Sequence, residues 1–170
     1  METLENNPSQ TETLHRILEG ALEGKHAHLS PMGALEALKL DITGRKILNT
    51  PYTIWQLLKH MNYWQDKFLA RLRGEEVRED ASWVEGWEET LNANDQQELE
   101  QEVDKLLLSI EHARTLMKEG DHQIRDQKYY ATKYDIVQSM ASHLSYHLAE
   151  LILLRRIFGA WPPPSGGFVW

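Results

Sequence analysis

The stretch LEQEVDKLLLSIEHARTLM, residues 99–117, has the clearest helical pattern in the chain. Its apolar residues alternate steps of four and three, at Leu99, Val103, Leu106, Ile110, Ala113 and Met117. This spacing is typical of a helix that packs lengthwise against neighbouring helices. Asn94, with Gln97 three residues later, resembles a capping box, and Gly120 is a C-terminal signal. The sequence therefore predicts a long amphipathic helix between these two ends.

Two further long helices are predicted before this stretch. The first covers residues 9–23, and its apolar side chains share one face, at Leu14, Ile17, Leu18, Ala21 and Leu22. A short helix follows, because Ser30 and Pro31 suit an N-cap and a first helical position. The second long helix begins near Thr53, a favourable N-cap residue, and ends at Gly74.

A fourth long helix is predicted near the C-terminus. It starts between Thr132 and Asp135 and stops at Gly159. The sequence WPPPSGG that follows, residues 161–167, cannot extend it, because consecutive prolines break a helix.

The connection from Gly74 to Asn94 contains Trp83 and Trp87 and is long for a compact domain. Such a segment is either functional or crosses the end of a helical bundle. The chain shows no alternating strand pattern and no internal repeat. Four amphipathic helices without strands predict an all-α four-helix bundle. We expect one domain over residues 1–170, because this length supports a single sizeable core.

Charge and composition exclude several classes of function. A formal net charge of −8 argues against a nucleic-acid binder, which needs a basic face. The chain has no cysteine, so disulfides, Cys-ligated zinc and thiol nucleophiles are excluded. The N-terminal METLENNPSQ is not a secretory signal, and the longest apolar run, LILL at 151–154, is too short to span a membrane. We expect a cytoplasmic protein that binds neither nucleic acid nor membrane.

Two histidines of the fourth helix have the spacing of metal ligands. Side chains four residues apart on a helix share a face, so His143 and His147 can converge on one point. Glu150 falls on the same stripe, where it either orients an imidazole or is an ordinary surface glutamate. The alternative is a pair of hydrogen-bonded histidines at the edge of the core. A further ligand must come from another helix, and His60 on the second long helix is the best candidate. The alternative for His60 is a lone buried or half-buried histidine.

The other histidines fit a site less well. His15 and His112 lack a partner at ligand spacing, and we expect them at the surface. His26, His28 and His122 are predicted in exposed loops, and the roles of His26 and His28 stay open.

Other known site patterns do not fit the chain. The Glu-x-x-His pairs of di-iron bundles occur only across glycines where helices end. The zinc-protease signature, the phosphate-binding glycine loop and the nucleophile elbow are missing. The six tryptophans are interpreted as packing anchors and rim residues.

Three segments carry a resemblance to a known family. SHLSYHLAELILLRRIFGAWPP, residues 142–163, resembles the last helix of the DinB/YfiT-like superfamily, with its His-x-x-Tyr-His run followed by Arg-Arg, Gly and Trp. TPYTIWQLLKHMNYWQDKFL, residues 50–69, is similar to that family's second helix with its single histidine. GKHAHLSPMGALEAL, residues 24–38, is similar to the segment between the first two helices in one branch.

The resemblance implies a four-helix bundle in up-down-down-up order. It also implies a metal triad formed by His60, His143 and His147, which would bind a divalent transition metal, zinc or nickel before iron or manganese. A homodimer is a further expectation from the family.

Three neutral histidines leave a metal with an open coordination position, as in catalytic zinc sites. Such a metal lowers the pKa of a bound water or deprotonates a bound thiol, so the site suits either hydrolysis or thiol transfer. Members of the family that the chain resembles include transferases and isomerases that use low-molecular-weight thiols such as bacillithiol or mycothiol. Other members are described only as metal-dependent hydrolases. We therefore expect a metal-dependent thiol S-transferase or hydrolase acting on a small molecule. The alternative is a non-catalytic, dimeric bundle with vestigial or structural histidines.

Four side chains near the predicted site have less definite roles. Tyr146 and Tyr63 either line a pocket or are simply packed. Arg155 and Arg156 point away from the stripe of His143 on a regular helix, so we expect them to face solvent or a partner subunit.

Overall fold

The computed structural model describes residues 8–25, 27–78, 84–120 and 129–167. In these ranges the regular structure is helical and no strand occurs, which confirms the all-α prediction. The helices are α1 (Gln10–Glu23), α2 (Pro31–Leu35), α3 (Leu40–Thr43), α4 (Ile54–Leu72), α5 (Gln96–Lys118) and α6 (Lys133–Ile157). The four long helices and the short α2 agree with the predictions, whereas the four-residue α3 was not predicted.

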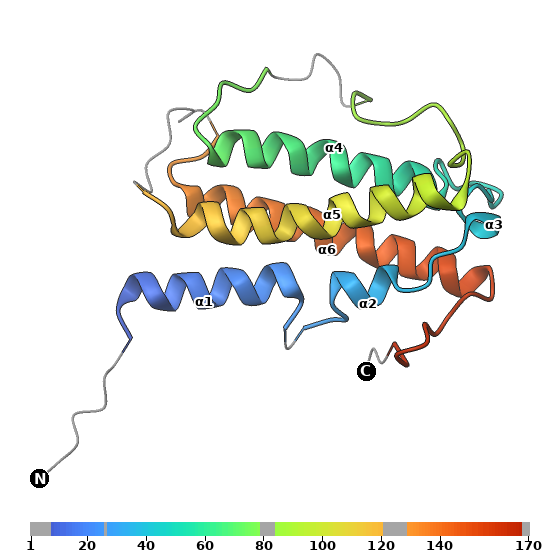
Figure 1. Ribbon diagram of the computed structural model, residues 1–170, viewed down its shortest axis with the longest axis horizontal. Helices are drawn as coiled ribbons and strands as arrows, with labels where there is room; N and C mark the ends of the chain where they lie inside the picture. The colour runs from blue at the N-terminus through green and yellow to red at the C-terminus, as the bar shows by residue number, and fades with distance from the viewer. Residues whose placement is uncertain (1–7, 26, 79–83, 121–128, 168–170) are drawn as a thin grey trace, which may run out of the picture.

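The four long helices lie side by side, with α4 packed against both α5 and α6, and α1 packed mainly against α6 (Figure 1). The colour ramp shows that α4 and α5 run in the same direction, while α1 and α6 run in the opposite one. The segment between α4 and α5 therefore returns along the length of the molecule before α5 begins. We call its part over residues 84–93 the crossover segment.

Apolar side chains fill the space between the helices. The predicted stripe of α5 is buried at every position except Val103, which is half-buried. On α1 the prediction holds for Leu18 and Leu22, but Leu14 and Ile17 are 41% and 52% exposed. Because α1 packs mainly on α6 and much less on α5, only one side of its apolar stripe is covered.

The helix starts follow local sequence signals, with one correction. Ser9, Thr53 and Thr132 each form a capping box, and Thr53 is the N-cap that the sequence predicts. The N-cap of α5 is Asp95, whose side chain accepts from the Glu98 amide at 2.8 Å. The predicted capping box that begins at Asn94 is therefore wrong by one residue.

Arg155 contradicts its prediction, because its side chain is buried, with 2% exposure. Its guanidinium donates to the carbonyls of Ala34 at 2.6 Å, Glu36 at 2.9 Å and Ala160 at 3.2 Å. Arg155 is covered because α2 and the chain after α6 pack over this side of α6. Arg156 is exposed, as expected.

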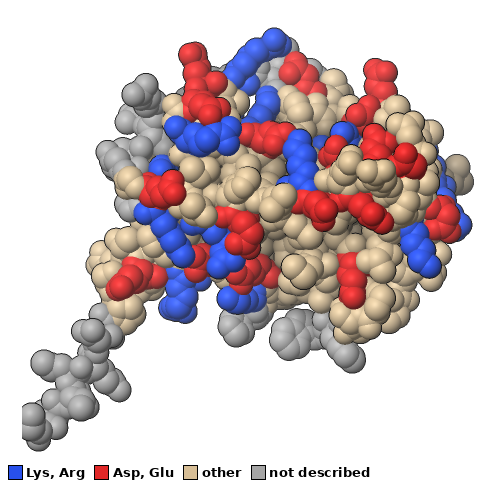
Figure 2. All heavy atoms as spheres, viewed as in Figure 1, with Lys and Arg blue, Asp and Glu red and all other residues tan. Residues whose placement is uncertain are grey.

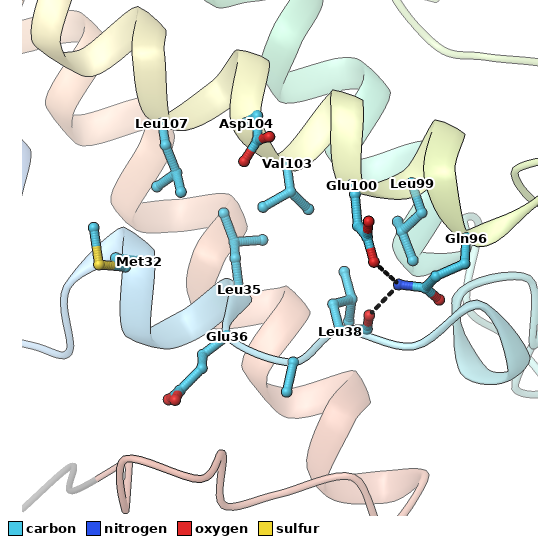
Figure 3. Close-up of a pocket in the computed structure, with 11 residues that line it drawn as sticks. Met32, Leu35, Glu36, Leu38, Gln96, Leu99, Glu100, Val103, Asp104 and Leu107 are labelled. Carbon is cyan, nitrogen blue, oxygen red and sulfur yellow. Dashed lines mark hydrogen bonds between the residues drawn. The ribbon is translucent and has the colours of Figure 1, made fainter.

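The chain between α2 and α4 is held against the start of α5. Gln96 donates to the Leu38 carbonyl at 3.1 Å and accepts from the Leu40 amide at 3.0 Å. Figure 3 shows Gln96 at one end of a pocket between α2 and α5, whose lining includes Met32 and Leu107. This contact fixes the polypeptide that leads into α4.

The surface seen in Figure 2 carries lysines and arginines interspersed with aspartates and glutamates. Two ion pairs join α4 to α5, Lys59 with Glu102 at 2.9 Å and Lys105 with Asp66 at 2.7 Å. Among the described residues, no helix has an apolar stretch long enough to cross a bilayer.

Candidate metal centre

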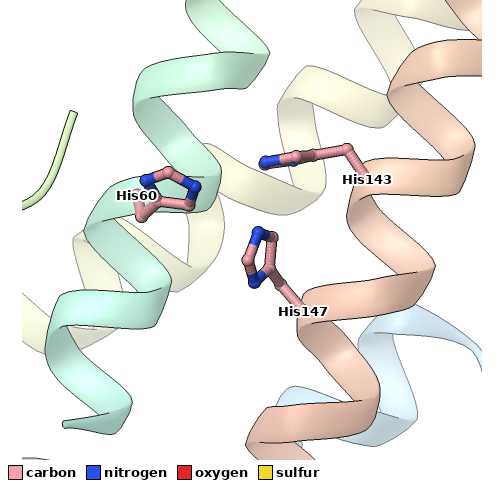
Figure 4. A group of neighbouring side chains, drawn as sticks. All are labelled: His60, His143 and His147. Atoms are coloured by element: carbon pink, nitrogen blue, oxygen red, sulfur yellow. The ribbon is translucent and has the colours of Figure 1, made fainter. Parts of the chain in front are cut away.

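Helices α4 and α6 bring three histidines together. Figure 4 shows His60 on α4 and His143 and His147 on α6 pointing toward one another. The ring centroid of His60 lies 5.3 Å from that of His143 and 4.8 Å from that of His147, and the centroids of the two α6 rings are 4.5 Å apart. The structure thus assembles the three side chains that the sequence singled out. It also places His60 and His147 below the surface, with 5% and 7% exposure.

Two of these histidines have a defined tautomer. The Nδ1 of His60 lies 3.2 Å from the Gly86 carbonyl, and the Nδ1 of His147 lies 2.8 Å from Oε2 of Glu150. Both oxygens are acceptors, so each Nδ1 carries a proton, and in the neutral form of each imidazole the lone pair is on Nε2. Glu150 therefore contacts a candidate ligand and is not an ordinary surface residue.

Burial lowers the pKa of two of the three histidines. Desolvation, together with the charge of His147, lowers the pKa of His60 to about 4. Desolvation and the charges of His147 and His60 lower the pKa of His143 to about 3. These two imidazoles are unprotonated near neutral pH, so a cation need not displace protons from them.

An aromatic stack covers one side of the cluster. The Trp87 ring lies on His60 at a centroid distance of 3.9 Å and an angle of 11°, and Tyr52 stacks on Trp87 at 5.0 Å and 6°. The Tyr52 hydroxyl donates to Oε1 of Glu150. Burial and this carboxylate raise the pKa of Tyr52, so the phenol remains a donor. Trp87 packs against the core, as interpreted, and also lies against the candidate site. Tyr52 was missed.

The crossover segment is held to the first turns of α4 by three side chains on one face. Thr53 donates to the Leu91 carbonyl at 2.8 Å, and Gln56 donates to the Glu88 carbonyl at 2.7 Å. The bond from His60 to Gly86 is the third. The Gln56 side-chain oxygen also accepts a hydrogen bond from the Thr53 amide at 3.0 Å, which caps the start of α4. The Gln56 side chain therefore both caps the helix and binds the crossover segment.

Gly86 allows the crossover segment to approach this closely. Its φ of +88° is in the region that favours glycine, and a Cβ there would lie 2.4 Å from Cδ1 of Tyr63. Tyr63 is therefore packed beneath the segment. The close packing lets the Gly86 carbonyl reach His60.

The remaining predicted residues lie outside the cluster. His15 is half-buried against Tyr134, with its Nε2 3.2 Å from the tyrosine hydroxyl, so the surface prediction is only partly right. His28 is also half-buried, and its Nδ1 donates to the Leu29 carbonyl at 2.8 Å. His112 is exposed, as expected. The predictions for His26, His122 and Trp83 lie outside the described residues. Tyr146 is 64% exposed, and its ring lies 5.0 Å from His147.

The donor set fits a divalent transition metal. Within the described ranges, one group of metal-ligand side chains emerges, and its three candidate nitrogens all lie within 4.8 Å of one another. A tetrahedral ion with bonds of about 2.0 Å needs nitrogens about 3.3 Å apart, so small side-chain rotations would suffice. Imidazole nitrogen is a suitable ligand for zinc, nickel, copper and iron.

Fold and site together define an all-helical protein with a three-histidine candidate metal centre between two neighbouring helices. A family model described as the DinB superfamily matches residues 32–151, which include all three histidines. The chain belongs to the DinB superfamily. Comparison with curated proteins and with solved structures gave no match.

Proposed function

We propose that the protein is a metal-dependent enzyme that transfers a low-molecular-weight thiol to an electrophilic small molecule. In this proposal His60, His143 and His147 hold a divalent transition metal, zinc or nickel. The proposed bundle has the up-down-down-up order of the family, which the helix directions in Figure 1 support.

The observation that carries the proposal is the engagement of Glu150. One oxygen of Glu150 accepts from His147 and the other from Tyr52, so this carboxylate is not free to become a fourth ligand. Three histidine ligands leave coordination open to substrate, the pattern of catalytic sites. A metal bound there would supply Lewis-acid activation that lowers the pKa of a thiol.

The rings around the cluster favour sulfur over water as the nucleophile. Trp64 and Phe68 lie with centroids 6.0 and 6.2 Å from His143, and Trp87 covers His60. Sulfur makes favourable contacts with aromatic rings, whereas these rings offer little to a hydrated nucleophile. In the transfer, the thiol sulfur bonds to the electrophilic carbon, the leaving group departs with its electron pair, and the thiol proton passes to solvent.

The first test is metal analysis of protein purified without a histidine tag. We expect about one equivalent of transition metal, or stoichiometric uptake on titration, and loss of tight binding in a folded His147→Ala variant. Less than a tenth of an equivalent without uptake would favour a non-catalytic bundle. The second test supplies chlorinated nitroaromatic electrophiles with and without bacillithiol or mycothiol. Thiol-dependent product formation supports the proposal, and thiol-independent hydrolysis contradicts it.

A further inference from the structure

Tyr52 connects the two helices of the site although it belongs to neither. It directly precedes the N-cap of α4, and its hydroxyl reaches Glu150 on α6. Its ring stacks on Trp87, which in turn stacks on His60. One side chain is therefore linked to a candidate ligand on each helix, through a carboxylate on one side and an indole on the other.

The link through Glu150 has a chemical consequence for His147. A neutral imidazole populates both tautomers unless a neighbour selects one, and Oε2 of Glu150 selects the form with the proton on Nδ1. The partly buried Glu150 side chain has several rotatable bonds, and its position is fixed by the second hydrogen bond, from the Tyr52 hydroxyl. Without that bond the carboxylate gains rotamers in which it no longer accepts from His147.

We propose that Tyr52 is a positioning residue of the metal centre: by holding Glu150 it fixes the tautomer of His147 and presents Nε2 of that histidine to the ion. The inference rests on the proposed metal site for its purpose, but the tautomer is a property of the metal-free protein. Hydrogen bonds to ligands typically change metal affinity 10- to 100-fold when they are lost.

The test compares the wild type with Tyr52→Phe, which keeps the stacked ring and removes only the hydroxyl. Nitrogen-15 NMR of metal-free protein distinguishes protonated from unprotonated imidazole nitrogens. We expect a single tautomer of His147 in the wild type and a mixture in Tyr52→Phe, with a zinc affinity lower by about tenfold. Tyr146→Phe is the matched control. It deletes a phenol hydroxyl from an exposed side chain whose ring lies 5.0 Å from that of His147, and both readouts are expected to stay at wild-type values.

Glu150 variants provide a second, independent arm. Glu150→Ala removes the acceptor and is expected to give the same mixture of tautomers. In Glu150→Gln the amide oxygen can still accept from Nδ1, so the single tautomer is expected to return. A Tyr52→Phe protein with the wild-type tautomer and affinity would overturn the inference. If the wild type binds no metal, the proposed function fails, while the NMR comparison still decides the role of Tyr52.

Discussion

Replacing Gly86 by alanine is expected to weaken metal binding while the protein stays folded. A Cβ at this position would lie 2.4 Å from Cδ1 and 2.7 Å from Cε1 of Tyr63. Because carbon atoms prefer separations near 3.5 to 4.0 Å, the crossover segment or the ring must move by about 1 Å. The Gly86 carbonyl already lies 3.2 Å from Nδ1 of His60, so a shift of this size in the segment breaks the hydrogen bond.

The expected magnitude is that of a lost hydrogen bond to a ligand, about 10- to 100-fold in affinity, or about 1.4 to 2.7 kcal/mol. Gly74→Ala is the control, since Gly74 has a similar φ of +76° but open space where the Cβ would be. Both variants carry backbone strain of about 1 to 2 kcal/mol, and only Gly86→Ala meets Tyr63.

The assay is a competition titration of metal-free protein with zinc and a chromophoric chelator, with circular dichroism to verify folding. The reasoning is refuted if Gly86→Ala binds zinc as tightly as the wild type. It is also refuted if Gly74→Ala loses as much affinity, because backbone strain alone would then explain the effect.

Three further predictions concern stability, each measured by urea denaturation of metal-free protein. Arg155→Met leaves three carbonyls without their charged donor and should lower the free energy of unfolding by about 3 to 5 kcal/mol. Its control is Arg156→Met at an exposed position, which should change this free energy by less than about 0.5 kcal/mol. Equal effects of the two variants would contradict the structural role of the buried Arg155. Gln65 is 2% exposed, and among the described residues neither of its amide atoms has a hydrogen-bond partner. Gln65→Met should therefore stabilise the protein by about 1 to 2 kcal/mol, and a loss of stability would contradict this. In the folded protein the pKa values of His60 and His143 are lowered to about 4 and 3, against 6.5 for a histidine in the unfolded chain. Between pH 6.5 and pH 4 these two residues take up protons mainly in the unfolded chain, so the free energy of unfolding should fall as the pH is lowered through this range. Each histidine contributes a slope of up to about 1.4 kcal/mol per pH unit, and an unchanged slope in a His60→Gln, His143→Gln variant would contradict the assignment.

The sequence allowed prediction of those parts of the fold that depend on neighbours along the chain. The stripe of α5 and the N-cap Thr53 are local patterns, and the structure reproduces them. The spacing of His143 and His147 is local as well, because four residues make about one helical turn. From the residues alone His60 was the best candidate for the further ligand, and the family resemblance then joined it to them, since periodicity carries no information on which helix lies opposite.

The contacts missed by the sequence interpretation join distant positions. Tyr52 and Glu150 are 98 residues apart, and His60 and Gly86 are 26 apart. The only local sequence sign of these contacts was the pair Gly86-Trp87, a glycine next to a large aromatic residue within an acidic stretch. The prediction for Arg155 was wrong for the same reason, because α2, which covers its side chain, lies more than a hundred positions earlier in the chain.

The two nitrogens of His60 face different parts of the molecule, one toward the cluster and one toward the crossover segment. Cation binding at His60 and attachment of the crossover segment are therefore thermodynamically coupled. If the attached segment makes cation binding more favourable, a bound cation stabilises the attached segment by the same free energy. Protease cleavage or amide hydrogen exchange between residues 84 and 93 would then report occupancy of a site that these amides never touch.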